Sequence, residues 1–188
     1  GGGFALMTEA IGAAAMMEIP AVFINVMRAG PSTGVPTKTE QGDLWQVLGA
    51  SQGDFERFIV APKDVLDAYN TVPELFNLVD RAQCPGIIIS DLLISEGTFN
   101  VDPDLLDLQP GIDRGALLVD PSPNGNYLRY LDTESGISPR VPPGYEGFVH
   151  TVATDEHDED GVLISDEFTN PHKRRKMVEK RARKFHAI

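Results

Sequence analysis

The chain has 188 residues, 41% of them hydrophobic, and a formal net charge of −12. This length fits one domain with an appendage, or one domain and part of another. No apolar run approaches the ~18 residues of a membrane helix, and the N-terminus lacks the basic and apolar regions of a secretory signal. The only cysteine, Cys84, excludes an internal disulfide framework and leaves too few thiolates for this chain alone to bind an iron–sulfur cluster. We therefore expect a cytoplasmic protein that does not enter a membrane.

Helical and extended patterns alternate over residues 1–97. Pro20 should end the first helix, and Pro73 should kink or restart the third, because proline lacks a backbone donor. Asp43 and Asp91 stand where helix caps are expected, although Asp91 could also be a site residue. In chain order, the sequence predicts a helix over 4–17, a strand over 21–27, a helix over 43–49, a strand over 57–60, a helix from about residue 63 and a strand over 86–91.

The predicted strands are uninterrupted apolar runs, which is typical of a parallel sheet covered on both faces. A doubly wound sheet usually has about five or six strands, and only about three are visible here. We therefore predict an α/β fold with a partial doubly wound parallel sheet, whose missing strands would precede Gly1. The three glycines that begin the chain stand before a helix, but no complete phosphate-binding motif surrounds them, so we interpret them as a tight turn.

The composition changes after residue 97. Residues 98–150 are rich in Pro, Gly and Asp, and we interpret them as an irregular extension that wraps over a neighbour. Short strands are expected within it, at 115–119, 127–130 and 148–152. Residues 151–188 combine an acidic turn with a basic helix, which is expected over 171–185. The predicted segments of the chain are therefore 1–97, 98–150 and 151–188.

The charge of the chain is distributed unevenly. Eight of the 16 Lys and Arg residues lie between Lys173 and Lys184, where Glu179 is the only acid. This stretch therefore carries +7, whereas residues 1–172, with 27 acids against 8 bases, carry −19. A basic helix could bind nucleic acid, but neither interleaved aromatic residues nor a nucleic-acid motif accompany it. We expect the helix to lie against an acidic neighbouring domain or to face water, without binding nucleic acid.

Residues 156–167 resemble a calcium-binding loop. Counted from Glu156, acids stand at positions 1, 3 and 5, a glycine at position 6 and Glu167 at position 12. Position 1 is usually Asp, however, and no long helical pattern precedes the loop. An acidic turn is the favoured interpretation, and calcium binding stays open. The four histidines do not fall at the spacing of zinc ligands.

The candidate binding site is the loop that follows the strand over 21–27. In open α/β sheets, ligands gather at the carboxyl ends of the strands, and Arg28 stands at that position. Its planar guanidinium suits a carboxylate or phosphate, unless it is a structural arginine paired with an acid. No nucleophile–base pair accompanies Arg28, so any reactive group must come from a cofactor or another subunit. The hydroxyl groups that favour an anion site here belong to Ser32, Thr33, Thr37 and Thr39.

Several segments of the sequence resemble the α subunit of 2-oxoacid:ferredoxin oxidoreductases, specifically of the 2-oxoglutarate type. The most specific is the Gly-Pro-Ser-Thr-Gly loop at residues 30–34, followed by Pro-Thr-Lys-Thr-Glu-Gln at 36–41. The matching segments follow the order of the family along nearly the whole chain, at residues 3–12, 28–41, 136–140, 156–161 and 177–181.

This resemblance implies a thiamine diphosphate enzyme that oxidatively decarboxylates a 2-oxoacid with coenzyme A, yielding acyl-CoA, CO2 and reduced ferredoxin. The α subunit would supply the domain that faces the aminopyrimidine ring of the cofactor, and residues 1–97 would be the latter part of that domain. A β subunit would carry the diphosphate, the magnesium ion and the iron–sulfur cluster. Arg28 matches the arginine that binds the substrate carboxylate, and Thr37 matches a threonine of the substrate pocket.

The sequence also departs from the family. The Tyr-Pro-Ile-Thr-Pro segment and the glutamate that tautomerises the aminopyrimidine would lie upstream of Gly1, so this piece alone is expected to be inactive. The basic helix would connect to a later, transketolase-like domain. Ala29 stands where glycine is common, and Pro73 interrupts a helix that is usually continuous. Pyruvate or branched-chain oxoacids stay open as substrates. A non-catalytic module that docks partners through its acidic body and basic helix is the alternative function.

Overall fold

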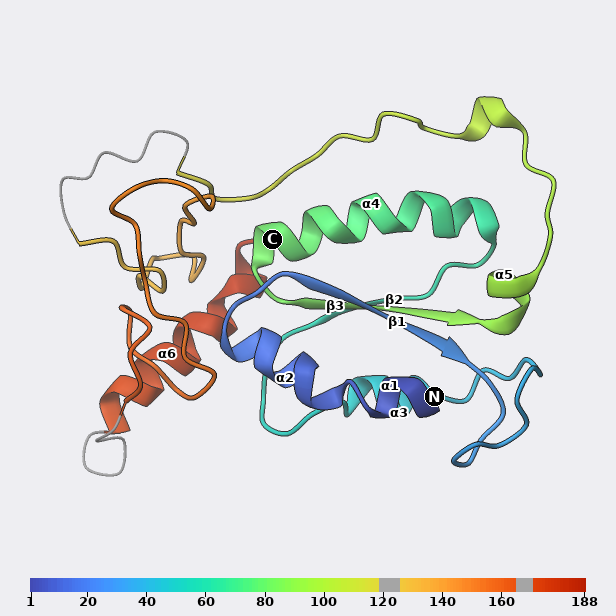
Figure 1. Ribbon diagram of the computed structural model, residues 1–188, viewed down its shortest axis with the longest axis horizontal. Helices are drawn as coiled ribbons and strands as arrows, with labels where there is room; N and C mark the ends of the chain where they lie inside the picture. The colour runs from blue at the N-terminus through green and yellow to red at the C-terminus, as the bar shows by residue number, and fades with distance from the viewer. Residues whose placement is uncertain (119–125, 165–170) are drawn as a thin grey trace. The chain divides into compact units, whose positions relative to one another are not determined.

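The computed structural model describes residues 1–118, 126–164 and 171–188. Its helices and strands lie mostly in the first half of the chain (Figure 1). In order, they are α1 (Gly2–Ala5), α2 (Thr8–Met16), β1 (Ala21–Met27), α3 (Leu44–Leu48), β2 (Phe58–Val60), α4 (Val65–Ala82), β3 (Pro85–Asp91), α5 (Leu92–Glu96), the 3₁₀ helix η1 (Pro103–Leu105), α6 (Pro171–Arg183) and the 3₁₀ helix η2 (Lys184–His186).

A parallel sheet of three strands confirms the predicted α/β fold. The strand order is β1-β3-β2, so β3 lies in the centre and all seven of its residues are buried. Along β1 and β3 the register runs from Ala21 opposite Pro85 to Met27 opposite Asp91. The three strands agree with the predicted ones to within one residue at each end. The continuous apolar run that predicted β3 is explained by the burial of that strand on both faces.

Helices cover both faces of the sheet (Figure 1). On one face, α4 places Leu75 and Val79 against Ile88 of β3, and each such fully buried aliphatic side chain contributes about 1.5–3 kcal/mol. Gly86 permits this close approach, since a Cβ there would come within 2.6 Å of Val79. On the opposite face, residues of the helices α1 to α3 and of the turn after α3 pack against side chains of β1 and β3. This cluster consists of Phe4, Ile11, Val47 and Ala50 together with Met27, Ile87 and Ile89 of the strands.

The single helix predicted over 4–17 is wrong, because the structure divides it into α1 and α2. The N–H groups of Leu6 and Met7 donate to the carbonyls of Gly3 and Phe4, three residues earlier, which is the tighter 3₁₀ spacing. Glycine weakens a helix by about 1 kcal/mol relative to alanine, so a start on three glycines favours this early end.

Helix α4 runs through Pro73 without interruption, so the helix does not restart there as one alternative predicted. Proline removes one hydrogen bond of the helix. Packing of Leu75 and Val79 against the sheet offsets that loss, since both side chains are almost fully buried.

The short strands predicted after residue 98 are wrong as far as the structure describes them. Residues 115–118 form one bridge, between Leu117 and Arg140, and residue 119 lies outside the described part of the chain. Arg140 donates to Ala116 and accepts from Leu118, and the pairing cannot continue to the next donor of this segment because Pro142 has no N–H. Residues 127–130 end in a turn, and residues 148–152 form no strand.

The described residues group into two compact units. The first comprises residues 1–80 and 84–113, and it contains the sheet. The second comprises residues 81–83 and 114–188, a division that differs from the three segments drawn from composition. Its core holds the side chains of Tyr130, Ile164 and Met177, all buried.

A buried polar network also belongs to the second unit. The side chain of Gln83 donates to the carbonyl of Ser138 at 2.6 Å and accepts from Arg129 at 3.0 Å. The ammonium group of Lys184 donates to the backbone carbonyl of Gln83 at 2.9 Å. Buried polar groups are costly unless they are hydrogen-bonded, so this network fixes one arrangement of the unit.

Candidate anion-binding site

The loop of residues 28–43, which we call the anion-binding loop after its candidate role, begins where β1 ends (Figure 1). Met27, the last residue of β1, lies opposite Asp91, the last residue of β3. Both parallel strands therefore end at the same edge of the sheet, and Arg28 leaves from that edge. This is the position at which parallel α/β sheets bind ligands.

The tip of the loop is closed by its own backbone. The N–H of Gly34 donates to Pro31 at 3.0 Å, and the N–H of Val35 donates to Ala29 at 3.1 Å. Gly34 has a φ of +58°, and a Cβ there would lie 1.7 Å from the carbonyl oxygen of Ala29. Only glycine fits this position, so the sequence Gly-Pro-Ser-Thr-Gly has a direct structural reason.

Two side-chain hydrogen bonds hold the far end of the loop to the sheet. Gln41 donates to Asp91 at 2.8 Å, and Asn25 of β1 donates to Asp43 at 3.1 Å. Asp91 and Asn25 are only 6% and 1% exposed. Buried acceptors and donors that are satisfied in this way define the path of a loop more strongly than exposed ones do.

Asp91 serves as the predicted helix cap, since its Oδ1 accepts from the N–H of Ile94 at 3.0 Å at the start of α5. The hydrogen bond from Gln41, together with that from Ile94, lowers the pKa of Asp91 below its ordinary value. Asp43 does stand before α3, but its predicted capping role is wrong: its side chain caps no N–H, and its ψ of 6° lies outside the extended region of an N-cap.

Arg28 is half-buried and has no acid as a partner among the described residues. Its Nε is buried without a hydrogen-bond partner, and Nη2 lies 3.7 Å from the position that a Cβ of Gly2 would take. The alternative of a structural arginine paired with an acid is therefore wrong for the part of the chain that the structure describes. An unsatisfied buried donor costs about 1–3 kcal/mol, which a bound anion would recover.

The predicted hydroxyl groups lie on the loop that follows Arg28. Ser32, Thr33 and Thr37 are all exposed, and within residues 1–118 no hydrogen bond joins them to one another or to Arg28. Ser32 and Thr37 have φ values of 55° and 60°, in the left-handed region. For a β-branched residue such as Thr37 this conformation is strained, and strained residues are concentrated at ligand-binding sites.

Sequence reasoning missed Asn25 and Gln41 as residues that shape the loop. A usable signal existed for Gln41: the loop must return to the sheet, and Asp91 ends the strand beside the one from which the loop leaves. Asn25 could have been suspected as a polar residue inside an apolar strand, because such a residue needs a partner.

The described part of the acidic turn, like the rest of the described chain, contains no group of three or more His, Cys, Asp or Glu side chains suited to a metal. Glu167, the twelfth position of the calcium pattern, lies outside the described residues. Glu156 and Glu159 form ion pairs with helix α6 instead.

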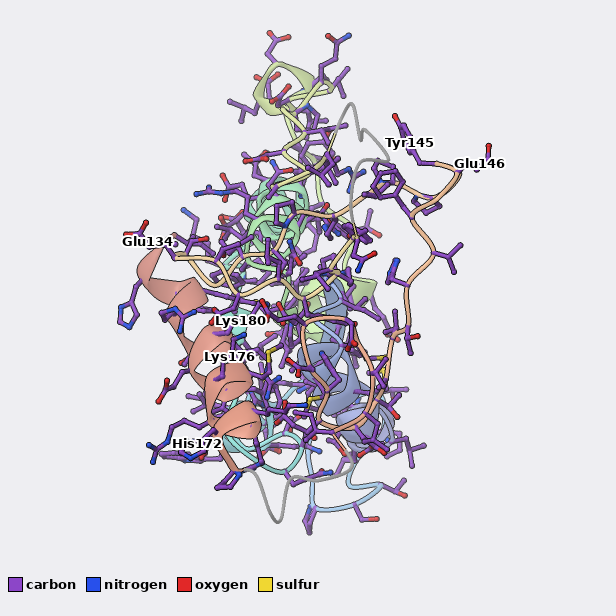
Figure 2. All side chains as sticks on the ribbon, turned by 90° about the vertical axis from the view of Figure 1, so that its left-hand side faces the viewer. Glu134, Tyr145, Glu146, His172, Lys176 and Lys180 are labelled. Atoms are coloured by element: carbon purple, nitrogen blue, oxygen red, sulfur yellow. The ribbon has the colours of Figure 1, made fainter. Side chains whose placement is uncertain are left out.

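Helix α6 uses its cations within its own unit. Arg181 pairs with Glu156 and Lys176 with Glu159, at 2.9 and 2.5 Å, and Lys173 lies 3.4 Å from Asp158. Figure 2 shows Lys176 and Lys180 along this helix. The helix therefore lies against the acidic turn, whereas the prediction was an acidic neighbouring domain or water.

No helix in the described part of the chain is both long and apolar enough to cross a membrane.

Comparison with known proteins identifies relatives for nearly the whole chain. Residues 1–180 match the family described as pyruvate flavodoxin/ferredoxin oxidoreductase, thiamine diphosphate-binding. The α subunit of 2-oxoacid:ferredoxin oxidoreductase 2 from Aeropyrum pernix is 38% identical over 191 residues, which is 100% of this chain and 28% of that protein. The 2-oxoglutarate synthase subunit KorA from Archaeoglobus fulgidus is 40% identical over 121 residues, which is 64% of this chain and 35% of that protein.

A solved structure is also similar. The 2-oxoglutarate:ferredoxin oxidoreductase from Magnetococcus marinus, with 2-oxoglutarate, coenzyme A and succinyl-CoA bound, matches with a TM-score of 0.79 and 32% identity. The match covers 97% of this chain and 31% of that one. This chain thus spans about a third or less of the length of these three relatives. The chain belongs to the thiamine diphosphate-binding pyruvate flavodoxin/ferredoxin oxidoreductase family.

Proposed function

We propose that this chain is part of the α subunit of a 2-oxoacid:ferredoxin oxidoreductase that acts on 2-oxoglutarate, and that Arg28 binds a carboxylate of the substrate. The observation that carries the proposal is the guanidinium of Arg28, which reaches the ligand-binding edge of the sheet without an acid partner among the described residues. The names of the relatives from Archaeoglobus fulgidus and Magnetococcus marinus support 2-oxoglutarate over other oxoacids.

The complete enzyme would convert a 2-oxoacid and coenzyme A into acyl-CoA and CO2, and pass two electrons to ferredoxin. Within it, Arg28 would orient the substrate by parallel hydrogen bonds to both carboxylate oxygens. Thr37, Ser32 and Thr33 would donate further hydrogen bonds from the same loop. We place this assembly in the cytoplasm, with a β subunit, ferredoxin and coenzyme A as partners.

Thiamine diphosphate, when bound, supplies the electron sink for decarboxylation. The described residues suit a substrate anion, and they include no group of three or more His, Cys, Asp or Glu side chains suited to a metal. Following the family resemblance, we assign the diphosphate, the magnesium ion and the iron–sulfur cluster to a β subunit. The residues of this chain would bind and orient the substrate.

The alternative function, a module that docks partners through its basic helix, finds less support. The cations of Lys173, Lys176 and Arg181 already have acidic partners on the turn of the same unit. A partner would have to displace these ion pairs before it could use the helix.

The test is to express the full-length α subunit that contains this chain together with its β subunit, and to measure ferredoxin reduction with 2-oxoglutarate, pyruvate and a branched-chain oxoacid. We expect activity that requires thiamine diphosphate and coenzyme A and has its highest kcat/KM with 2-oxoglutarate. A preference for pyruvate would show that the proposed substrate is wrong while the proposed class of enzyme is right. The absence of oxoacid-dependent reduction, with salt-sensitive binding to many charged proteins, would favour the docking module.

A further inference from the structure

We infer that Gln41 and Asp91 are positioning residues for the anion-binding loop: their hydrogen bond ties the returning arm of the loop to the end of β3 and so keeps Arg28 and Thr37 in a shape that binds the substrate. The consequence for catalysis rests on the proposed function. The contact itself is a feature of the first unit, with Gln41 Nε2 lying 2.8 Å from Asp91 Oδ2.

The topology brings both arms of the loop to one residue. The outgoing arm begins at Arg28, directly after Met27, and Met27 lies opposite Asp91 in the register of β1 and β3. The returning arm reaches Asp91 through the side chain of Gln41. Asp91 therefore stands at the base of the loop, beside the point where the loop leaves the sheet and at the point where it returns.

Asp91 is a rigid anchor. Its two carboxylate oxygens have separate tasks, because Oδ1 accepts from the N–H of Ile94 at 3.0 Å and Oδ2 accepts from Gln41. The side chain is buried at the junction of β3 and α5, and the same hydrogen bonds favour its charged form. A charged acceptor makes each of these hydrogen bonds stronger than a neutral one would be.

Apart from the hydrogen bond between Asn25 and Asp43 at its base, the returning arm has little else to hold it. Residues 36–42 are all exposed, and the hydrogen bond of Gln41 is the one side-chain hydrogen bond that they make within the described structure. The bonds of Gly34 and Val35 close the tip of the loop but do not tie it to the sheet. Loss of the Gln41–Asp91 bond would therefore free Thr37 while the fold of the sheet persists.

The pair also permits an exchange of roles. Gln41→Glu would place two carboxylates 2.8 Å apart, where both cannot be charged without repulsion. Adding Asp91→Asn would let the new amide at position 91 donate to the carboxylate at position 41, while its oxygen still accepts from Ile94. The double variant restores the hydrogen bond with donor and acceptor exchanged and with the same total charge.

The experiment compares wild type, Q41E, D91N and Q41E/D91N in the complete α–β enzyme. Trypsin cleavage after Lys38, followed by mass spectrometry, measures how firmly the loop is held, independently of catalysis. The KM for 2-oxoglutarate and kcat measure substrate binding and turnover. Gln41→Ala serves as a second disrupting variant should Q41E fail to assemble.

We expect Q41E to raise both the rate of cleavage at Lys38 and the KM by about 2- to 10-fold, with a smaller effect on kcat. This is less than the full effect of a lost charge-assisted hydrogen bond, because the pair acts on the substrate only through the loop. The KM of Q41E should approach the wild-type value as the pH falls, because one proton shared by the two carboxyl groups restores a hydrogen bond. Q41E/D91N should return both readouts to within about twofold of wild type.

Three results would overturn the inference: unchanged cleavage in Q41E, increased cleavage with an unchanged KM, or no recovery in Q41E/D91N. Failure of the proposed function is a different result. In that case the wild-type enzyme would not oxidise 2-oxoacids, while the cleavage at Lys38 would still respond to Q41E and recover in the double variant.

Discussion

Arg181 on α6 donates hydrogen bonds of 2.9 Å to both carboxylate oxygens of Glu156 on the acidic turn. Both side chains are largely buried, at 14% and 7% exposure, so water screens the pair only weakly. A sequence with a strongly acidic body and a basic helix thus neutralises part of its charge within one unit. The helix and the turn stabilise each other.

Removing the guanidinium should loosen this unit. Arg181→Ala would leave Glu156 with Arg174 at 3.9 Å as its remaining partner in the described structure, and we expect a loss of about 1.5–3 kcal/mol. Hydrogen exchange of the α6 amides measures the effect locally. Arg175→Ala, on the exposed side of the same helix, is the matched control and should change the protection by less than about 0.5 kcal/mol. Equal effects of the two variants would contradict a specific role for the pair.

The ion pair of Lys176 and Glu159 predicts that the stability of the second unit depends on pH. Burial alone would raise the pKa of Glu159, but hydrogen bonds from the Asp132 N–H and from Lys176 hold it below its ordinary value of 4.5. The hydrogen bond to Glu159 in turn raises the pKa of Lys176 above 10.5. The ion pair therefore stabilises the folded state at pH values between the unfolded-state pKa of Glu159 and that of Lys176. On the acid side, this stabilisation is lost as the pH falls through the lowered pKa of Glu159. On the alkaline side, it is lost as the pH rises through the raised pKa of Lys176.

Glu159→Gln tests this dependence, since glutamine can still accept from the Asp132 N–H at 2.7 Å while losing the charge. Near pH 7, the amides of α6 should be better protected from hydrogen exchange in the wild type than in the variant. This difference should shrink as the pH falls below 4.5. A difference that stays constant from pH 7 to pH 3 would show that the charge of Glu159 does not stabilise the helix.

Gly34 should be irreplaceable in the anion-binding loop. Gly34→Ala would place a methyl group 1.7 Å from the carbonyl oxygen of Ala29 at a φ of +58°, so the turn must open. We expect the KM for 2-oxoglutarate to rise about 10-fold or more in the complete enzyme, with the sheet intact by circular dichroism. Gly111→Ala is the control, because nothing lies within 4 Å of its Cβ position. Equal KM values for the two variants would show that the shape of this turn does not affect substrate binding.

Local pattern was sufficient to predict the sheet and the position of Arg28. Continuous apolar runs predicted all three strands, and the rule for parallel sheets predicted Arg28 at the carboxyl edge of the strands, where the structure places it. The contacts that shape the site were beyond such reasoning, because Gln41 and Asp91 are 50 positions apart. Only the register of β1 and β3 brings them together.

The second unit was predicted less well for a related reason. Its apolar pieces look like strands, yet Pro142 has no N–H at the position where the ladder beside Arg140 would continue, and isolated bridges and side-chain networks are found instead. The basic helix was recognised from composition. Its partner, the acidic turn 25 positions before Arg181, could not be identified without the fold.

The measurement that tests the account most directly is the steady-state kinetics of Arg28→Ala in the complete α–β enzyme, with 2-oxoglutarate varied at saturating coenzyme A. Lys63→Ala, an exposed cation before α4, is the control. Loss of a charge-assisted hydrogen bond of about 1.5–3 kcal/mol predicts a fall in kcat/KM of roughly 10- to 150-fold for R28A, partial recovery in R28K and no change in K63A. Wild-type kinetics in R28A would contradict the assignment of Arg28 to the substrate.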